Sequence, residues 1–290
     1  MEAAVQARLA PAAIRNAMTI DVEDYFQVSA FADHIPRDSW GTLDCRVEAN
    51  IDRILALLEA RGIHATFFTL GWIAERYPAM VRRIVAGGHE LASHGYGHLR
   101  ASDQDRDQFR EDIARSKILL EDIGGYPVLG YRAPSFSIGP GNMWALDVLR
   151  ECGYRYSSSI YPIQHDHYGM PDAPRFAWYP RGPGGLLEVP VTTVRILQRN
   201  LPAGGGGYFR FFPYAVSRWF LQQVNRRDGQ PGIFYFHPWE IDPGQPRQQG
   251  IPLKTRFRHY INLDRMESRL AALTRDFRWD RMDRIFLNQP

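Results

Sequence analysis

Apolar residues in the first two thirds of the chain recur at two alternating spacings. Residues 47–60 (VEANIDRILALLEA) carry them on one helix face and are followed by Arg61-Gly62, a common end of a helix. Residues 65–70 form instead a short β-branched and aromatic run, which is typical of a strand. Repeated strand–helix units of this length predict an α/β fold with parallel strands and helices packed outside them.

The same criteria divide the remaining chain into elements. Strands are predicted at residues 17–22, 65–70, 91–94, 128–131, 154–157, 186–190 and 233–237. Helices are predicted at residues 47–60, 79–86, 103–123, 143–152, 213–225 and 262–276. The pattern breaks in the Pro-, Gly- and His-rich residues 161–185 and at the four consecutive glycines 204–207, where we expect a mobile or tightly turning loop. No repeat or linker divides the chain, so the sequence predicts one domain with a long insertion.

Composition narrows the class of protein. The 290 residues are 44% hydrophobic and 23% charged, as in a well-packed globular protein, and the net charge of +3 argues against nucleic acid as the main partner. Two cysteines, Cys45 and Cys152, fit a reducing compartment better than a disulfide scaffold. The first 16 residues lack the apolar core of a secretory signal, and no apolar run approaches the roughly 20 residues of a membrane-spanning helix. We therefore expect a cytoplasmic protein without a transmembrane segment.

Two histidines follow the predicted strand at residues 91–94. In His94-Gly-Tyr-Gly-His98 the imidazoles lie four residues apart across a turn that contains glycine. Imidazole nitrogen is a common zinc ligand, and a catalytic zinc site typically uses three protein ligands and leaves one position for water. The alternative interpretation is a pair of surface loop histidines.

An acidic cluster, Asp21-Val22-Glu23-Asp24, ends the first predicted strand. Carboxylates this close repel one another unless a cation or a positive side chain lies between them. Alternate residues of a strand share a face, so Asp21 and Glu23 point together, whereas a bend after Val22 would let Asp24 take the place of Glu23. A solvated acidic loop is the alternative.

Two further groups follow predicted strands. Arg132 is placed to pair with one of the first-strand carboxylates and to orient it, although any surface arginine at a strand end would look similar. His237 emerges from an aromatic strand and is placed to donate a proton, unless it is a core histidine bonded to the backbone. All these groups follow the carboxyl ends of predicted parallel strands, where the active sites of α/β barrels gather. Their convergence favours one shared site.

The ordered motifs of the chain resemble those of the NodB-type polysaccharide deacetylases (carbohydrate esterase family 4). The motifs are Thr19-Ile-Asp-Val-Glu-Asp24, His94-Gly-Tyr-Gly-His98, Arg132-Ala-Pro134 and Phe236-His237, with scaffold segments at residues 62–68 and 88–91. Three later stretches, at residues 205–210, 236–240 and 256–262, resemble a subgroup found with bacterial exopolysaccharide and exosortase loci. The likeness extends from about residue 17 to the C-terminus.

This resemblance implies a fold and an activity. The fold is a distorted (β/α)7 barrel, here with a long irregular insertion, a catalytic core at about residues 17–240 and a C-terminal extension at about residues 241–290. The activity is metal-dependent hydrolysis of N-acetyl groups on the amino sugars of an exopolysaccharide or its precursor, with zinc as the expected divalent metal. The polysaccharide or oligosaccharide substrate is the only partner that the resemblance implies.

The resemblance also implies residue roles. Asp21 corresponds to the general base, Arg132 to the residue that orients it, and His237 to the general acid. His94 and His98 correspond to metal ligands, and the acidic ligand is Asp24 or Glu23. Tyr131, Pro134 and Trp239 are expected to bind the sugar, the two aromatic rings by stacking.

One position departs from the family pattern. Where the family commonly has an aspartate that steadies the acid histidine, this chain has Ser157, so Asp166, Asp242 or Glu240 would have to support His237. This departure keeps open a non-catalytic carbohydrate-binding protein. Hydrolysis of a cyclic amide on the same fold is the other alternative.

Overall fold

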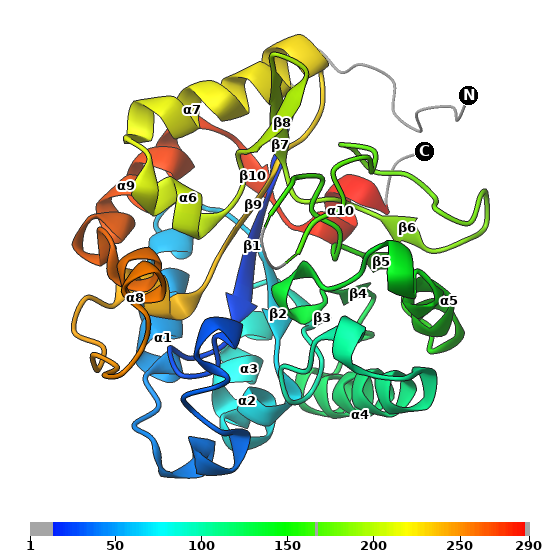
Figure 1. Ribbon diagram of the computed structural model, residues 1–290, viewed down its shortest axis with the longest axis vertical. Helices are drawn as coiled ribbons and strands as arrows, with labels where there is room; N and C mark the ends of the chain where they lie inside the picture. The colour runs from blue at the N-terminus through cyan, green and yellow to red at the C-terminus, as the bar shows by residue number, and fades with distance from the viewer. Residues whose placement is uncertain (1–13, 166–167, 288–290) are drawn as a thin grey trace.

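A curled parallel sheet forms the centre of the protein (Figure 1). The computed structural model describes residues 14–165 and 168–287. Strand β9 pairs with β1, and β2 to β6 follow in chain order, every pair parallel, while β10 pairs with the start of β1. The strands are β1 (Asn16–Val22), β2 (Thr66–Thr69), β3 (Glu90–Ser93), β4 (Gly130–Tyr131), β5 (Tyr156–Ser157), β6 (Leu187–Glu188), β9 (Ile233–Phe236) and β10 (Trp279–Asp280).

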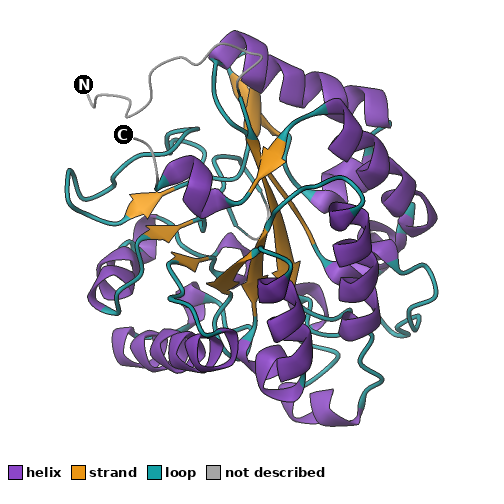
Figure 2. Ribbon diagram, turned by 180° about the vertical axis from the view of Figure 1, so that it is seen from behind, coloured by secondary structure: helices purple, strands orange, loops and turns teal. Residues whose placement is uncertain are grey.

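Helices surround the sheet on its outside (Figure 2). They are α1 (Val47–Glu59), α2 (Gly71–Arg76), α3 (Pro78–Ala86), α4 (Arg106–Gly124), α5 (Trp144–Glu151), α6 (Gly206–Phe211), α7 (Tyr214–Gln223), α8 (Leu253–Tyr260), α9 (Leu263–Asp276) and α10 (Met282–Phe286). Short 3-10 turns are η2 (Ser29–Phe31), η3 (Arg37–Thr42), η4 (Ala101–Asp103), η5 (Pro134–Phe136), η6 (Pro140–Asn142) and η8 (Pro238–Ile241), and η7 (Val224–Asp228) is a π-turn. Strands alternate with outer helices along most of the chain, which confirms the expected distorted (β/α)7 barrel.

Local sequence explains where the elements begin and end. Strand β1 is buried at every position, as expected for a parallel strand covered on both faces. Helix α1 buries Val47, Ile51, Ile54 and Leu58 at helical spacing. Helix α4 begins with a capping box and ends at Gly125, whose φ of 72° suits a left-handed C-cap.

The barrel is closed between β6 and β9 by irregular chain and not by direct pairing of these two strands within the described residues. The segment after β6 bonds to the β5 side through Val189 and Val191, and Gly204 accepts a hydrogen bond from the Tyr235 amide of β9. Between these contacts a small hairpin, β7 (Thr193–Ile196) and β8 (Arg199–Pro202), projects outward. The hairpin and the chain around it therefore stand where a regular barrel would continue its sheet, whereas the predicted insertion at residues 161–185 lies between the paired strands β5 and β6.

Several predicted elements are corrected by the structure. The glycine run expected to be a loop contains the start of α6, and the hairpin, α2, α8, α10 and β10 were not predicted. The predicted last helix, α9, is followed by β10, which pairs only with Asn16 and Ala17, and two residues are too few to give a periodic signal. Both cysteines are free thiols. Among the described residues, no helix has the length and apolar character needed to span a membrane.

Two acids are buried inside the sheet. Glu90 accepts hydrogen bonds from Thr66 and Tyr156, and Glu188 accepts the amide hydrogens of Ser159 and Ile160 at 2.8 Å each. Burial raises the pKa of each carboxyl to about 7. Because the folded-state pKa lies above the unfolded one, the folded protein binds these protons more tightly, and stability is lost as the pH rises from about 4.5 to about 7.

We expect Glu188→Gln to remove the contribution of this carboxyl to the pH dependence while retaining an oxygen acceptor for the two amides. At each pH, the free energy of unfolding of the wild type is subtracted from that of the variant. This difference should be about 1–3 kcal/mol more positive at pH 8 than at pH 4.5, because the variant does not lose stability through this carboxyl as the pH rises. Urea unfolding at the two pH values measures this difference. Glu59→Gln, at an exposed position, is the matched control, and an equal effect of both variants would contradict the assignment.

Candidate active site

The three acids that end β1 have different surroundings. Asp21 and Glu23 are both about 2% exposed and point toward the same group of histidines. Asp24 turns away, and its Oδ2 accepts hydrogen bonds from the Arg46 and Val47 amides at 2.5 and 2.8 Å. Asp24 thus accepts hydrogen bonds at the start of α1, and it is not in the group of potential metal ligands found among the described residues, contrary to one of the two sequence predictions.

The loop from His94 to His98 is held by α4 and contains two residues with positive φ. The Asp112 carboxylate accepts the Tyr96 amide hydrogen and lies so close to Gly95 that a Cβ there would overlap with it. Gly95 has a φ of 76°, which suits glycine, and His98 has a φ of 52°, which is rare for a residue with a side chain. Such strain persists where surrounding contacts over-determine a functional position.

The His94 ring is oriented by the backbone of a neighbouring strand. Its Nδ1 lies 2.8 Å from the Arg132 carbonyl oxygen, which directs Nε2 toward the acids. Burial lowers the pKa of His94 to about 4, so the imidazole is neutral at physiological pH. Neutral imidazole with its second nitrogen bonded to a carbonyl is the form in which histidine binds metals in proteins.

Glu23, His94 and His98 form a group that fits a divalent metal. One potential ligand atom from each lies within 4.8 Å of the others, and all three side chains are buried. Glu23 Oε2 lies 2.7 Å from His98 Nε2 and has no other hydrogen-bonding partner among the described residues. Two imidazoles and one carboxylate match the ligand set of catalytic zinc sites. Between the two acids that the sequence left open, the geometry therefore selects Glu23.

Arg132 and Asp21 form a buried ion pair beside this group. Arg132 Nη1 donates to Asp21 Oδ1 at 2.6 Å and to Thr19 Oγ1 at 2.8 Å, while Nε and Nη2 donate to the carbonyl and hydroxyl oxygens of Ser158. The guanidinium also lies over the Phe68 ring. A fully buried, multiply bonded arginine fixes one carboxylate oxygen and leaves Asp21 Oδ2 directed toward His237.

His237 lies at the mouth of the site. Its Nε2 is 3.6 Å from Glu23 Oε1 and 4.0 Å from Asp21 Oδ2, and its side chain is 20% exposed, whereas those of the two acids are at most 3% exposed. Burial alone would lower the pKa of His237, but the carboxylates of Glu23 and Glu240 raise it to about 9. The arrangement can therefore present a proton at the entrance.

Glu240 supports His237, as one of the three proposed substitutes for the missing family aspartate. Glu240 Oε1 lies 2.8 Å from His237 Nδ1 and also accepts the His237 amide hydrogen. Asp242 instead pairs with Arg46, and Ser157 bonds to Ser159. The remaining substitute, Asp166, lies outside the described residues.

The three predicted sugar-binding residues are buried, which is a correction. Tyr131 packs in the core against Phe109 and Tyr154, because residues of a strand covered on both faces do not reach solvent. Pro134 begins a buried turn. Trp239 stacks on His237 and donates its indole hydrogen to Glu23 Oε1 at 3.2 Å, so it supports the site from behind.

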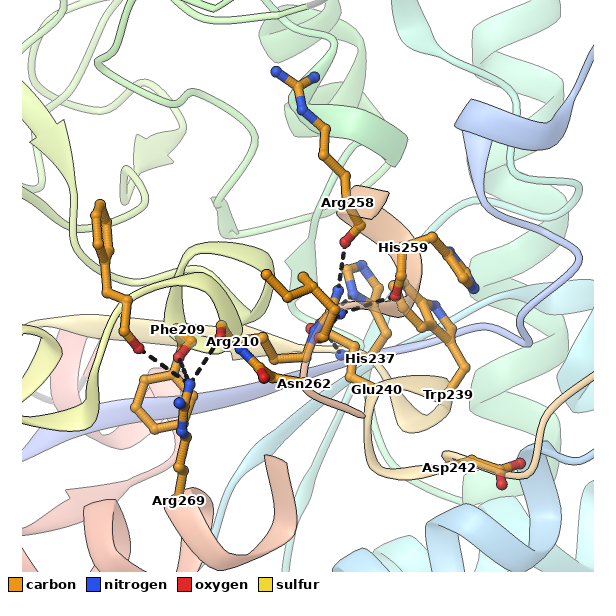
Figure 3. A network of polar contacts seen from close by, with 12 residues as sticks. Phe209, Arg210, His237, Trp239, Glu240, Asp242, Arg258, His259, Asn262 and Arg269 are labelled. Carbon is orange, nitrogen blue, oxygen red and sulfur yellow. Dashed lines mark hydrogen bonds and ion pairs between the residues drawn. The ribbon is translucent and has the colours of Figure 1, made fainter. Parts of the chain in front are cut away.

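Arg210 was not identified from the sequence. This 1% exposed side chain on α6 donates to Glu240 Oε2 at 2.6 Å and so reaches the support of His237 (Figure 3). The signal that pointed toward it was its place in the subgroup-like stretch at residues 205–210. The role of a single arginine after a glycine run cannot be inferred from the sequence, because it depends on the side chain that the arginine contacts.

Comparisons with known proteins agree with this geometry. Residues 34–157 match the family model described as polysaccharide deacetylase, and residues 158–287 match a domain of unknown function, DUF3473. The chain carries a polysaccharide deacetylase domain of the NodB type. The deacetylase match contains His94, His98 and Arg132, whereas His237, Glu240 and Arg210 lie in the DUF3473 match. The two matched segments contribute strands to one sheet and side chains to one site.

Individual relatives match parts of the chain. A peptidoglycan-N-acetylglucosamine deacetylase of Bacillus cereus is 34% identical over 82 residues, which are 28% of this chain and 30% of that protein. A peptidoglycan deacetylase of Helicobacter pylori is 29% identical over 113 residues, which are 39% of this chain and 38% of that protein. The matched region thus spans well under half of these relatives.

The fold also has a counterpart among solved structures. A Mycobacterium smegmatis protein described as a polysaccharide deacetylase aligns with a TM-score of 0.60 at 23% identity, covering 98% of this chain and 93% of that one. At this identity the likeness concerns the fold. It extends over the DUF3473 match as well as the deacetylase match.

Separate substitution of Glu23 and Asp24 tests which of the two acids is the metal ligand. Glu23→Gln should weaken Zn²⁺ binding by more than about 100-fold, since even an outer-shell partner of a metal ligand contributes about 10- to 100-fold. Asp24→Ala should retain Zn²⁺ binding but lower the free energy of unfolding by about 1–3 kcal/mol, because two amides at the start of α1 lose their acceptor. Calorimetric Zn²⁺ titration and urea unfolding of both variants measure the two effects. The reverse pattern would return the ligand role to Asp24.

Proposed function

We propose that this chain is a metal-dependent hydrolase that removes N-acetyl groups from the amino sugars of a bacterial exopolysaccharide or its precursor. The observation that carries the proposal is the convergence of three chemical groups at the carboxyl ends of β1, β3, β4 and β9. These are a carboxylate–guanidinium pair, Asp21 with Arg132; a potential metal site, Glu23, His94 and His98; and a supported imidazole, His237.

The metal has a defined place in this proposal. Glu23, His94 and His98 would hold a divalent cation, with zinc expected from the ligand types. Such an ion polarises an amide carbonyl and lowers the pKa of water to near 7 in favourable cases. The protein supplies the proton transfers and the positioning.

Asp21 and His237 divide the proton transfers. Asp21 Oδ2, free of Arg132, accepts a proton from the attacking water, and Arg132 keeps Asp21 ionised and oriented through Oδ1. His237 Nε2 donates a proton to the sugar nitrogen as the carbon–nitrogen bond breaks, which gives acetate and a free amine. Because the two side chains approach to 4.0 Å, one substrate amide can contact both.

The substrate class is supported by the relatives. The Bacillus cereus relative is named for N-acetylglucosamine in peptidoglycan, and the family model is named for polysaccharide. A cavity of about 340 Å³ is lined in part by Phe136 and Ser137, which follow Arg132 closely in the chain, and by Arg100, which follows His98. We assign this cavity to a neighbouring sugar unit in place of the buried Tyr131, Pro134 and Trp239. The cytoplasmic location and the exopolysaccharide remain predictions from the sequence.

Acetate release from N-acetylglucosamine oligomers tests the activity. We expect Zn²⁺-loaded protein to release acetate and Asp21→Asn to reduce the rate by at least about 100-fold, since a positioned acid or base contributes about 10²–10⁴-fold. His94→Ala should also reduce the rate strongly, because it removes a metal ligand. A chelator should abolish the activity and added Zn²⁺ should restore it. His34→Ala, at an exposed histidine, is the control and should retain the wild-type rate.

The same assay separates the alternatives. Activity that survives both Asp21→Asn and His94→Ala would refute the assigned site. Turnover of a cyclic amide without acetate release would instead identify a cyclic-amide hydrolase. Saturable oligosaccharide binding without turnover, with Zn²⁺ present, would identify a carbohydrate-binding protein.

A further inference from the structure

Three stretches of the DUF3473 segment meet around Arg210 and the buried carboxylate that it contacts. They are residues 205–210, 236–240 and 256–262, and the carboxylate is that of Glu240, which is fully buried (Figure 3). The mechanism above uses only His237 of these stretches. The other residues therefore need an explanation.

Arg210 is bonded on all three of its guanidinium nitrogens. Nε donates to Glu240 Oε2 at 2.6 Å, Nη1 donates to the carbonyl oxygens of His259 and Ile261 at 2.8 and 2.7 Å, and Nη2 donates to that of Arg258 at 3.2 Å. These carbonyls lie at the C-terminal end of α8, the negative end of the helix dipole. A planar guanidinium held at three edges is fixed in position and in orientation.

The glycine run brings Arg210 to this place. A Cβ at Gly206 would overlap with both carboxylate oxygens of Glu240, and one at Gly205 would press on the Tyr235 ring. Gly206 and Arg210 are four residues apart in α6, so both face Glu240. The run is therefore the contact surface by which α6 packs against β9 and η8.

Helix α9 holds α6 from the other side. Arg269 Nη1 donates to the carbonyl oxygens of Phe209, Arg210 and Phe212, and Asn262 Nδ2 also donates to that of Arg210 (Figure 3). These bonds satisfy the carbonyls that the end of a short helix leaves free. The backbone that carries Arg210 is thus as constrained as its side chain.

A second set of contacts reaches the same histidine. The His259 ring bonds to Gln245 and stacks on Trp239 with ring centres 4.2 Å apart, and Trp239 stacks on His237 at 5.1 Å. His237 is therefore held at its Nδ1 edge by Glu240 and on one face by Trp239. Both supports originate in the DUF3473 segment.

We propose that the DUF3473 segment is a positioning unit for the proton donor, in which Arg210 fixes Glu240 and Glu240 fixes the His237 ring with Nε2 directed into the site. We call the Arg210–Glu240 ion pair the brace. This inference rests on the proposed function, and it makes Arg210 a positioning residue that does not itself contact substrate. Each Glu240 oxygen has its own partner, Oε2 with Arg210 and Oε1 with His237, so rotation of the carboxylate would break both contacts.

The brace predicts a loss that depends on the leaving group. An amine leaves a sugar amide only with a proton, whereas 4-nitrophenolate leaves its acetate ester without one. We therefore expect Arg210→Met to lower kcat on N-acetylglucosamine oligomers by about 10- to 100-fold with KM nearly unchanged, and to change ester hydrolysis less than about threefold. Arg210→Lys keeps the positive charge but lacks the several planar donors of a guanidinium, so it should recover part of the amide activity.

Arg175→Met provides the matched control. Arg175 forms an ion pair with Asp228 at 2.8 Å, away from His237, so this variant should retain both activities. If Arg210→Met lowers amide and ester hydrolysis equally, or leaves both unchanged, the positioning role is wrong. If it fails to fold, Glu240→Gln, which keeps the size of the side chain, replaces it and is expected to give the same selective loss.

Proton NMR tests the position of His237 without any need for enzyme turnover. The His237 Nδ1 hydrogen bonded to Glu240 should give a low-field proton NMR signal in the wild type, absent in Glu240→Gln and weakened or shifted in Arg210→Met. Should the wild type hydrolyse neither substrate, the proposed function fails, yet these spectra still decide whether the brace orients His237. A signal unchanged in Arg210→Met would overturn the brace.

Discussion

The site depends on the neutralisation of carboxylates that the fold takes out of water. Asp21, Glu23 and Glu240 are each at most 2% exposed, and an isolated charge so buried would be strongly unfavourable. Each one faces a cationic or metal-binding partner: Asp21 faces Arg132, Glu240 faces Arg210, and Glu23 faces the imidazoles of His98 and His237. Removing one partner would leave an uncompensated buried charge, so each carboxylate has to stay in contact with its partner. The strands bring the acids together, and the pairs set which oxygen of each acid remains free for chemistry.

The partners come from both matched segments, so neither contains a complete site. The deacetylase match supplies the histidine loop and Arg132, while the DUF3473 match supplies the proton donor and its support. Strand β9 makes this division workable, because it pairs with β1 in the sheet although more than 200 residues separate them along the chain. His237 at the end of β9 thereby lies beside Asp21 and Glu23 at the end of β1. The two family models divide the sequence near residue 157, but the barrel and its site are built from residues on both sides of this division.

The sequence predicts those features that local pattern controls. Alternation along β1 correctly places Asp21 and Glu23 on one face, and strand–helix spacing gives the fold class. The choice between Glu23 and Asp24 depends instead on the amides of Arg46 and Val47, a contact across more than 20 residues that no local pattern encodes. Tyr131 looked like a sugar platform because it adjoins Arg132, but its side chain points to the opposite face of β4, into the core. The role of Arg210 depends on its contact with Glu240, 30 residues later in the chain, which no local pattern indicates.

The serine at position 157 is consistent with its surroundings. Ser157 ends β5 and pairs in register with Glu188 of β6, whose buried carboxylate already bonds to the amides of Ser159 and Ile160. An aspartate at position 157 would place a second carboxylate beside Glu188, with the neighbouring Arg132 already committed to Asp21. The hydroxyls of Ser157 and Ser159 form instead a neutral chain that ends on the Ala133 amide and orders the loop behind Arg132. The β5 side therefore supports the arginine of the base, and support of the proton donor lies on the β9 side, where Arg210 supplies the positive charge that a buried Glu240 requires.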